Sequence, residues 1–213
     1  MCTRYYMELS PELRPIIEAA RRSSLTGRMV DKLGKALKTE GEVRPTDMVP
    51  VLAPDKSGRQ TVYPMIWGFT FPGMERPIVN ARVESADSRP SFRESWQRRR
   101  CVIPASWYYE WDHIQVKGKK KAGSKYAIQP VDAAVTWLAG LYRIETGYAG
   151  FRYPVFSVLT RNPSPELLKI HDRMPVILPE DAISRWISPE LSHAEIRDIA
   201  DHSLTEMVAE KCV

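Results

Sequence analysis

The stretch MVPVLAPDKSGRQTVYPMIWGFTF, residues 48–71, decides the fold that we predict for this chain. It contains two β-prone runs, 48–53 and 61–71, separated by Asp55-Lys56-Ser57-Gly58, whose residue types favour a tight turn. We therefore expect a β-hairpin here. Similar short β-prone runs recur along the chain, at residues 78–83, 101–104, 107–111, 126–129, 135–142, 154–159 and 174–178.

Helical patterns are fewer than strand patterns. Ser10-Pro11-Glu12 is typical of a helix start, because Ser can accept from a free backbone N–H, Pro has no N–H to satisfy, and Glu suits the positive end of the helix dipole. The predicted helices cover residues 10–24, 28–39, 92–99, 165–170, 180–186 and 192–201. Many short strands with few intervening helices favour a single α+β domain over residues 1–213, with a largely antiparallel, barrel-like core and peripheral helices.

Size and composition exclude several classes of protein. A chain of 213 residues with 43% hydrophobic and 27% charged residues is typical of a globular domain, not of a disordered, collagenous or coiled-coil protein. No window approaches the roughly 18 uninterrupted apolar residues of a membrane span. Arg4, Glu8, Glu12 and Arg14 lie where a signal peptide needs an apolar core. We expect a cytoplasmic, monomeric protein with no membrane partner.

Metal and common cofactor sites are not indicated. Cys2, Cys101 and Cys212 lie far apart without a CxxC pair, which argues against a zinc site or a disulfide framework. The chain has no GxGxxG, P-loop or GxSxG motif, so nucleotide-binding and serine-hydrolase functions lose support. We expect no cofactor.

Basic residues are unevenly distributed in a chain whose formal net charge is +5. Arg98, Arg99 and Arg100 are consecutive, and residues 113–125 contain five lysines and no acid. Such clusters suit a phosphate backbone, whereas solvated loop charges that add solubility remain the alternative.

Cys2 follows the initiator methionine. Removal of Met1 would leave an α-amine beside the thiol of Cys2, and such a 1,2-aminothiol condenses with an aldehyde to an imine that the thiol closes to a thiazolidine. Reference pKa values near 8 for the amine and 8.5 for the thiol give both groups an accessible nucleophilic form. The alternative is that a Met-Cys start is a chance feature of a frayed terminus.

Three further segments carry candidate site residues. Alternation along the predicted strand 78–83 turns Asn80, Arg82 and Glu84 to one face, which suggests a polar cleft on an interior strand or the wet side of an edge strand. Glu110 lies within an aromatic run that would desolvate its carboxylate and raise its pKa. His171 follows a predicted helix, where it is either a proton shuttle or a simple helix-end residue.

These residues, in this order, resemble the SOS response-associated peptidase (SRAP) family of abasic-site sensors. The motifs that carry the resemblance span most of the chain: Met1-Cys2 with Arg4, Trp67-Gly68, Asn80-Ala81-Arg82 with Glu84, Arg100-Cys101-Val102-Ile103-Pro104, Tyr109-Glu110-Trp111 and Ile170-His171-Asp172-Arg173-Met174-Pro175. Departures from the pattern are Thr3 in place of Gly, Trp107-Tyr108 in place of Gly-Phe, and the segment Arg44-Pro45-Thr46.

The resemblance implies a DNA damage function. Cys2 would form a thiazolidine crosslink with the ring-opened abasic deoxyribose in single-stranded DNA, with Asn80, Glu110 and His171 as the other active-site groups. The DNA-binding residues would be Arg82 and Arg173, which hold phosphates, together with Arg4 and Trp67. Trp67 would be an exposed stacking aromatic, with a core position as the alternative.

The roles of the four active-site groups follow from their chemistry. His171 would pass protons to and from the sugar ring oxygen, Glu110 would take the proton of the Cys2 ammonium, and Asn80 would orient the amine or the sugar. Because the product is a covalent protein–DNA adduct, each protein molecule would react only once. A thiol peptidase or amidohydrolase with Cys2 as its N-terminal nucleophile, with or without lyase activity, and a noncovalent single-strand binder are the alternatives.

Overall fold

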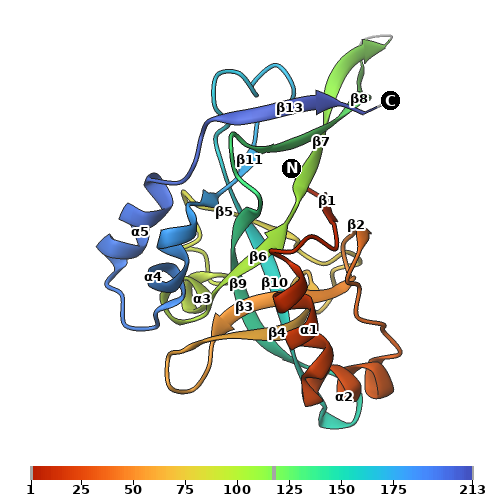
Figure 1. The fold of residues 1–213 in the computed structure, drawn as a ribbon, viewed down its shortest axis with the longest axis vertical. Coiled ribbons are helices and arrows are strands. Elements are labelled where there is room, and N and C mark those ends of the chain that lie inside the picture. Colours follow the sequence, from red (N-terminus) through yellow and green to blue (C-terminus); the bar gives the residue numbers. More distant parts are fainter. Residues whose placement is uncertain (1, 117–118, 213) are drawn as a thin grey trace.

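A closed barrel of five strands forms the centre of the molecule (Figure 1). The structure, a computed structural model, describes residues 2–116 and 119–212. The barrel strands are, in order of pairing, β10 (Arg152–Arg161), β4 (Gln60–Trp67), β3 (Met48–Pro54), β6 (Arg100–Ala105) and β9 (Thr136–Thr146). The barrel closes because β9 also pairs with β10, and the β10–β4 pair is parallel whereas the other four are antiparallel. The predicted α+β fold with a largely antiparallel barrel is confirmed.

The predicted hairpin is the β3–β4 pair. Its register runs from Met48 opposite Ile66 to Pro54 opposite Gln60. Asp55 closes the turn, because its carboxylate accepts hydrogen bonds from the backbone N–H groups of Ser57 and Arg59 at 2.8 and 3.0 Å. Side-chain caps of this kind are the reason that Asp favours turns.

A second, antiparallel sheet lies beside the barrel. Its strand order is β13 (Met207–Lys211), β8 (Lys119–Pro130), β7 (Trp107–Val116), β1 (Arg4–Met7) and β2 (Gly41–Val43). The strands β7 and β8 form a long hairpin that projects from the body, and β1 lies at its base (Figure 1). Most of the lysine-rich segment 113–125 therefore belongs to this hairpin and not to a loop, while its residues 117 and 118 lie outside the described residues.

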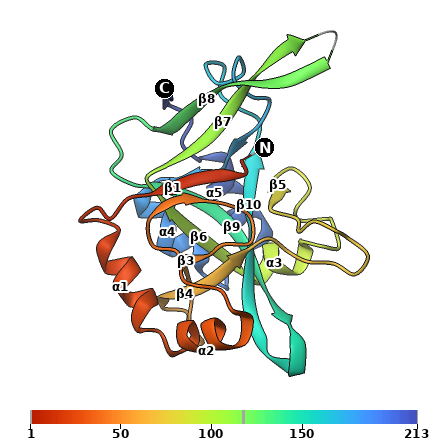
Figure 2. The same cartoon turned by 90° about the vertical axis from the view of Figure 1, so that its right-hand side faces the viewer.

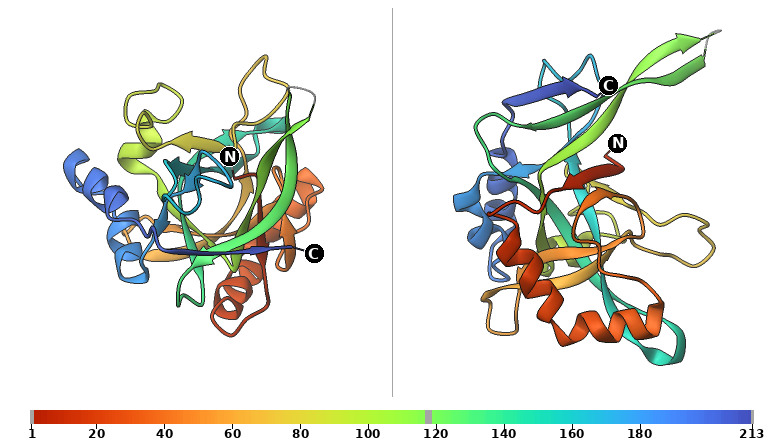
Figure 3. Two further views of the ribbon diagram at one scale, coloured as in Figure 1. Left: turned by 90° about the horizontal axis from the view of Figure 1, so that it is seen from above. Right: turned by 45° about the vertical axis from the view of Figure 1, so that its right-hand side comes forward.

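Short helices lie on the outside of the barrel. Figure 2 and Figure 3 show α1 (Arg14–Arg22) and α2 (Ser24–Leu33) on one side, away from α4 (Ile183–Ile187) and α5 (His193–Asp201). Gly34, with φ of +64°, ends α2 before the predicted end at residue 39. Residues 165–170, predicted as a helix, form consecutive turns. In the described part of the chain, no helix has both the length and the apolar character that crossing a membrane requires.

Arg100 joins the barrel to two helices. This residue is fully buried, and its guanidinium donates to the carbonyl oxygens of Trp96 at 2.6 Å and Trp186 at 2.8 Å, at the ends of α3 (Arg93–Arg98) and α4. A cation at a helix C-terminus satisfies carbonyl groups that lack an intrahelical partner. The arginine run at residues 98–100 is thus partly internal, which removes Arg100 from any phosphate-binding surface.

Candidate active site

Sheet pairing brings the four candidate active-site residues together. Cys2 lies two residues before the start of β1. This strand pairs with β7 so that Arg4 lies opposite Tyr109, the neighbour of Glu110. Asn80 begins β5 (Asn80–Arg82), which pairs with β10. The segment after His171 forms β11 (Met174–Pro175), which also pairs with β10. Segments far apart in the sequence therefore converge on one site.

Short contacts and charge interactions link the four residues in a chain. The Asn80 Nδ2 group donates to the Cys2 carbonyl oxygen at 2.8 Å. The charge of Glu110 acts on the Cys2 thiol, and Glu110 Oε2 lies 3.9 Å from His171 Nε2. These contacts link the four residues that the sequence analysis names as active-site groups, and their catalytic roles stay a prediction.

Burial sets the protonation of these groups. Cys2 is 0% exposed, and burial, followed by the charge of Glu110, raises the pKa of its thiol far above the usual range. Burial also raises the pKa of Glu110 to about 7 and lowers that of His171 to about 4. At neutral pH the thiol is protonated, His171 is uncharged, and Glu110 exchanges a proton readily.

The His171 ring is oriented by its own segment. The backbone N–H of Arg173 donates to His171 Nδ1 at 3.0 Å, and Asp172 Oδ1 lies 2.9 Å from the same nitrogen. When the neutral ring accepts at Nδ1, its hydrogen is on Nε2, which is the nitrogen nearer to Glu110. His171 can therefore donate from Nε2 in its uncharged form.

Asn80, Arg82 and Glu84 alternate with buried residues, as predicted. Ala81 and Val83 are buried, whereas Arg82 and Glu84 are exposed and Asn80 is half-buried. The prediction of an interior strand is wrong, because β5 pairs with β10 and with no other strand in the described part of the chain. Arg82 thus lies on an edge strand with its side chain in solvent.

Arg173 does not lie free for a phosphate. It is 9% exposed, and its guanidinium donates to both carboxylate oxygens of Glu84 at 2.8 Å, to Asn162 Oδ1 at 2.8 Å and to the Thr160 carbonyl oxygen at 2.7 Å. The pKa of Glu84 is lowered by this hydrogen bonding. Arg173 therefore ties the His171 segment to β10, and its role as a phosphate contact stays a prediction.

Trp67 is a core residue. It is 0% exposed, its ring stacks on that of Phe156 with centroids 6.0 Å apart, and its Nε1 donates to the Val79 carbonyl oxygen at 2.9 Å. The expectation of an exposed stacking aromatic is wrong. The alternative, a packed tryptophan on a strand, is confirmed.

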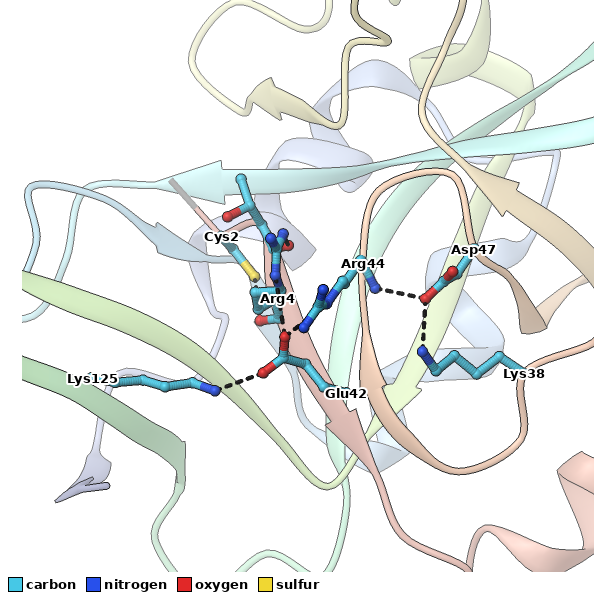
Figure 4. A network of polar contacts seen from close by, with 8 residues as sticks. Cys2, Arg4, Lys38, Glu42, Arg44, Asp47 and Lys125 are labelled. Atoms are coloured by element: carbon cyan, nitrogen blue, oxygen red, sulfur yellow. Dashed lines mark hydrogen bonds and ion pairs between the residues drawn. The ribbon is translucent and has the colours of Figure 1, made fainter. Parts of the chain in front are cut away.

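Sequence reasoning missed an ion-pair network next to Cys2 (Figure 4). The Glu42 carboxylate pairs with Lys125 Nζ at 2.6 Å, Arg44 Nε at 3.0 Å and Arg4 Nε at 3.3 Å. Nearby, Asp47 pairs with Lys38 Nζ at 3.1 Å. The lysine-rich segment that contains Lys125 was the one available signal, because Glu42 lies in a short strand without a recognisable motif.

Comparisons with known proteins agree with these motifs. A family model described as SOS response associated peptidase (SRAP) matches residues 1–212. "Abasic site processing protein YoaM" of Bacillus subtilis (strain 168) is 34% identical over 113 residues, which cover 53% of this chain and 48% of that protein. "Abasic site processing protein YedK" of Escherichia coli (strain K12) is 31% identical over 143 residues, which cover 64% of this chain and 60% of that protein.

Solved structures share the fold. The crystal structure of a protein from Bacteroides thetaiotaomicron superposes with a TM-score of 0.75 at 22% identity, covering 100% of this chain and 92% of that one. The chain spans about half the length of the first curated relatives it matches, so those relatives do not by themselves establish its activity. The family model, in contrast, extends over nearly every residue, and the chain belongs to the SOS response associated peptidase (SRAP) family.

Proposed function

We propose that this protein is a sensor of abasic sites in single-stranded DNA that forms a covalent thiazolidine crosslink through Cys2 after removal of Met1. The observation that carries the proposal is the meeting of Cys2 with Asn80, Glu110 and His171. The names of the curated relatives, abasic site processing proteins, support the same substrate. The protein would act as a monomer in the cytoplasm, where it meets the DNA of the nucleoid.

The proposed reaction joins one aldehyde to the aminothiol. The amine of Cys2 adds to the aldehyde of the ring-opened deoxyribose, and loss of one water gives an imine. The thiol then adds across the C=N bond, its sulfur binding to carbon while its proton ends on nitrogen. The product is the oligonucleotide plus the protein less one water, and no oxidant or reductant takes part.

Glu110 accepts a proton and His171 donates a hydrogen bond in this proposal. The Glu110 carboxylate, with a pKa of about 7, accepts the proton of the Cys2 ammonium near neutral pH. His171, uncharged and carrying hydrogen on Nε2, donates a hydrogen bond that polarises the ring oxygen as the sugar opens, while solvent water takes the proton of the C1 hydroxyl and supplies one to the ring oxygen. This hydrogen bond from the neutral ring replaces the proton shuttle near pH 6.5 that the sequence suggests.

Asn80 would orient the reacting amine. Its Nδ2 holds the Cys2 carbonyl oxygen, and its buried Oδ1 accepts no hydrogen bond from the described residues. A buried acceptor without a donor is costly, so a donor at this position is favourable. The amine of processed Cys2 is a suitable donor, because it is attached to the same Cα as the carbonyl that Asn80 holds.

The DNA strand would follow the basic residues that remain accessible. Arg82 on β5 is exposed, and the network around Glu42 places Arg4, Arg44 and Lys125 near Cys2. Single-stranded DNA suits a buried nucleophile, because an unstacked sugar can enter a site that a duplex cannot reach. Phosphate contacts of this kind weaken as salt rises.

An intact-mass experiment tests the proposal. Protein with Met1 removed is incubated with a single-stranded oligonucleotide that carries one abasic site, and we expect the mass of one oligonucleotide less one water to be added. Cys2→Ala should abolish this adduct while leaving noncovalent affinity for undamaged single strands nearly unchanged. An unmodified mass with fully processed protein would refute the covalent function.

The thiol peptidase alternative has weaker support from the site. It requires Asn80 as an oxyanion donor, but one of the two N–H groups on Asn80 Nδ2 already donates to the Cys2 carbonyl oxygen. It also requires an accessible thiolate, which burial of Cys2 opposes. The third alternative is a noncovalent single-strand binder. Such a protein would have the same affinity for DNA as the crosslinking sensor but would form no adduct.

A further inference from the structure

His113 is a histidine beside the active site to which the proposed function gives no role. It lies on β7, its side chain is exposed, and its ring contacts that of His171 with centroids 5.2 Å apart and planes inclined at 55°. Only 13% of the His171 side chain is exposed, and the neighbouring ring contributes to this burial.

A β-bulge places His113 at this position. Trp111 pairs with Lys125 across the β7–β8 hairpin, but the next pair is His113 with Ala122, so β8 has one extra residue. Asp112 stabilises the bulge, because its carboxylate accepts from the Ser124 N–H at 2.8 Å. Bulges locally increase strand twist and redirect side chains.

Gly123 is part of the same β-bulge. A Cβ at Gly123 would lie 2.1 Å from Asp112 Oδ1, far inside contact distance. Asp112 also accepts from the Tyr126 hydroxyl at 3.3 Å, which holds the carboxylate from a second side. The sequence therefore specifies this local geometry, and the contact of His113 with His171 follows from it.

Other described groups face the two ring nitrogens of His171. Glu110 faces Nε2 from β7, while Asp172 and the Arg173 N–H face Nδ1 from the segment that carries His171. The charge of the chain's amino terminus also acts on the ring, as does His113. Both nitrogens of His171 are thus engaged by groups near the ring edge, and the ring of His113 is a separate, non-hydrogen-bonding contact.

We propose that His113 is a positioning residue for His171, whose ring it covers and holds with Nε2 turned toward Glu110. The contact excludes water from His171 and favours its uncharged form. The projecting β7–β8 hairpin becomes part of the active site, because its bulge determines where the covering ring lies. This inference rests on the proposed function for its kinetic consequence, although the orientation and protonation of His171 can be measured without DNA.

Two substitutions separate ring contact from other properties of His113. His113→Ala removes the covering ring, and His113→Phe keeps a ring of similar shape without a titratable group. His202→Ala is the matched control, since His202 is an exposed histidine at the end of α5 that bonds Asp198. Thermal unfolding of each variant reports whether the fold is retained.

The first readout is the titration of His171, followed by NMR of histidine-labelled protein without DNA. We expect His113→Ala to move the titration midpoint of His171 upward by about one pH unit, whereas His113→Phe and His202→Ala leave it near that of the parent protein. An unchanged midpoint in His113→Ala, or equal shifts in the Ala and Phe variants, would overturn the positioning role.

The second readout is the crosslinking rate with an abasic single strand at pH 7. Loss of orientation should slow His113→Ala about tenfold, and the Phe variant should recover most of that rate. Equal rates for the parent protein and His113→Ala would overturn the kinetic consequence. If the parent protein forms no crosslink, the proposed function fails, and the NMR titration still decides the role of His113.

Discussion

Replacing Glu110 with glutamine should slow crosslinking in a pH-dependent way. The carboxylate is 4% exposed and its pKa is raised to about 7 by burial, so it is ionised in about half of the molecules at pH 7 and in nearly all at pH 9. The wild-type rate should therefore rise only about twofold over this interval, and it should fall as the pH drops below 7.

The glutamine variant must rely on amine that is already unprotonated. With a reference pKa near 8, that fraction grows from about 9% at pH 7 to about 90% at pH 9, a tenfold increase. A general base contributes about a hundredfold or more, so we expect a defect of that size at pH 7 that shrinks about fivefold by pH 9.

Single-turnover crosslinking rates across this pH range provide the measurement. Glu190→Gln, which changes an exposed acid in the turn before α5, is the matched control and should follow the wild-type profile. A constant fold defect of Glu110→Gln from pH 7 to pH 9 would show that Glu110 does not act as the base for the Cys2 ammonium.

Other expectations concern stability, trapping and DNA affinity. Because the folded pKa of Glu110 lies above its unfolded value, stability should fall by about 3 kcal/mol as pH rises from about 4.5 to above 7, and urea unfolding of Glu110→Gln should lack this loss. Cys2→Ser keeps the amine but cannot form the sulfur ring, so borohydride should trap its imine with an abasic strand, and no reduced adduct would contradict attack by the amine. Arg82→Gln should reduce the salt slope of single-strand affinity by about one, and an unchanged slope would exclude a phosphate contact. Trp67→Ala should lower the free energy of unfolding by about 3–5 kcal/mol, since Trp67 is a core residue, and a loss below about 1 kcal/mol would contradict that position.

Local patterns predict the strands well but not their pairing. The β3–β4 hairpin follows from two β-prone runs and the Asp55 turn, and these signals act over a few neighbouring residues. Barrel closure depends on β10 meeting both β4 and β9, which no local pattern specifies. The short strand β1 was missed because four residues give too little periodicity to detect.

Exposure of individual site residues is also a tertiary property. The motifs that carry the family resemblance identify Cys2 and Glu110, and the β1–β7 register brings their segments together. Trp67 and Arg173 belong to the same motifs, but Trp67 packs on Phe156 and Arg173 pairs with Glu84. A sequence motif specifies that a residue is required, and only the packing shows whether it faces the ligand or supports the site.

The burial of Cys2 implies an order of steps in the proposed reaction. The amine has a reference pKa near 8 and is accessible near neutrality, whereas burial holds the thiol protonated. Amine attack should therefore come first.

The protonated imine that results carries a positive charge close to the sulfur, and a nearby opposite charge favours the thiolate. Glu110, whose charge raises the pKa of the thiol before the reaction, becomes neutral on taking a proton and stops opposing its ionisation. The thiol thus becomes reactive only after the aldehyde is bound, which protects a buried nucleophile from other electrophiles until its substrate is in place.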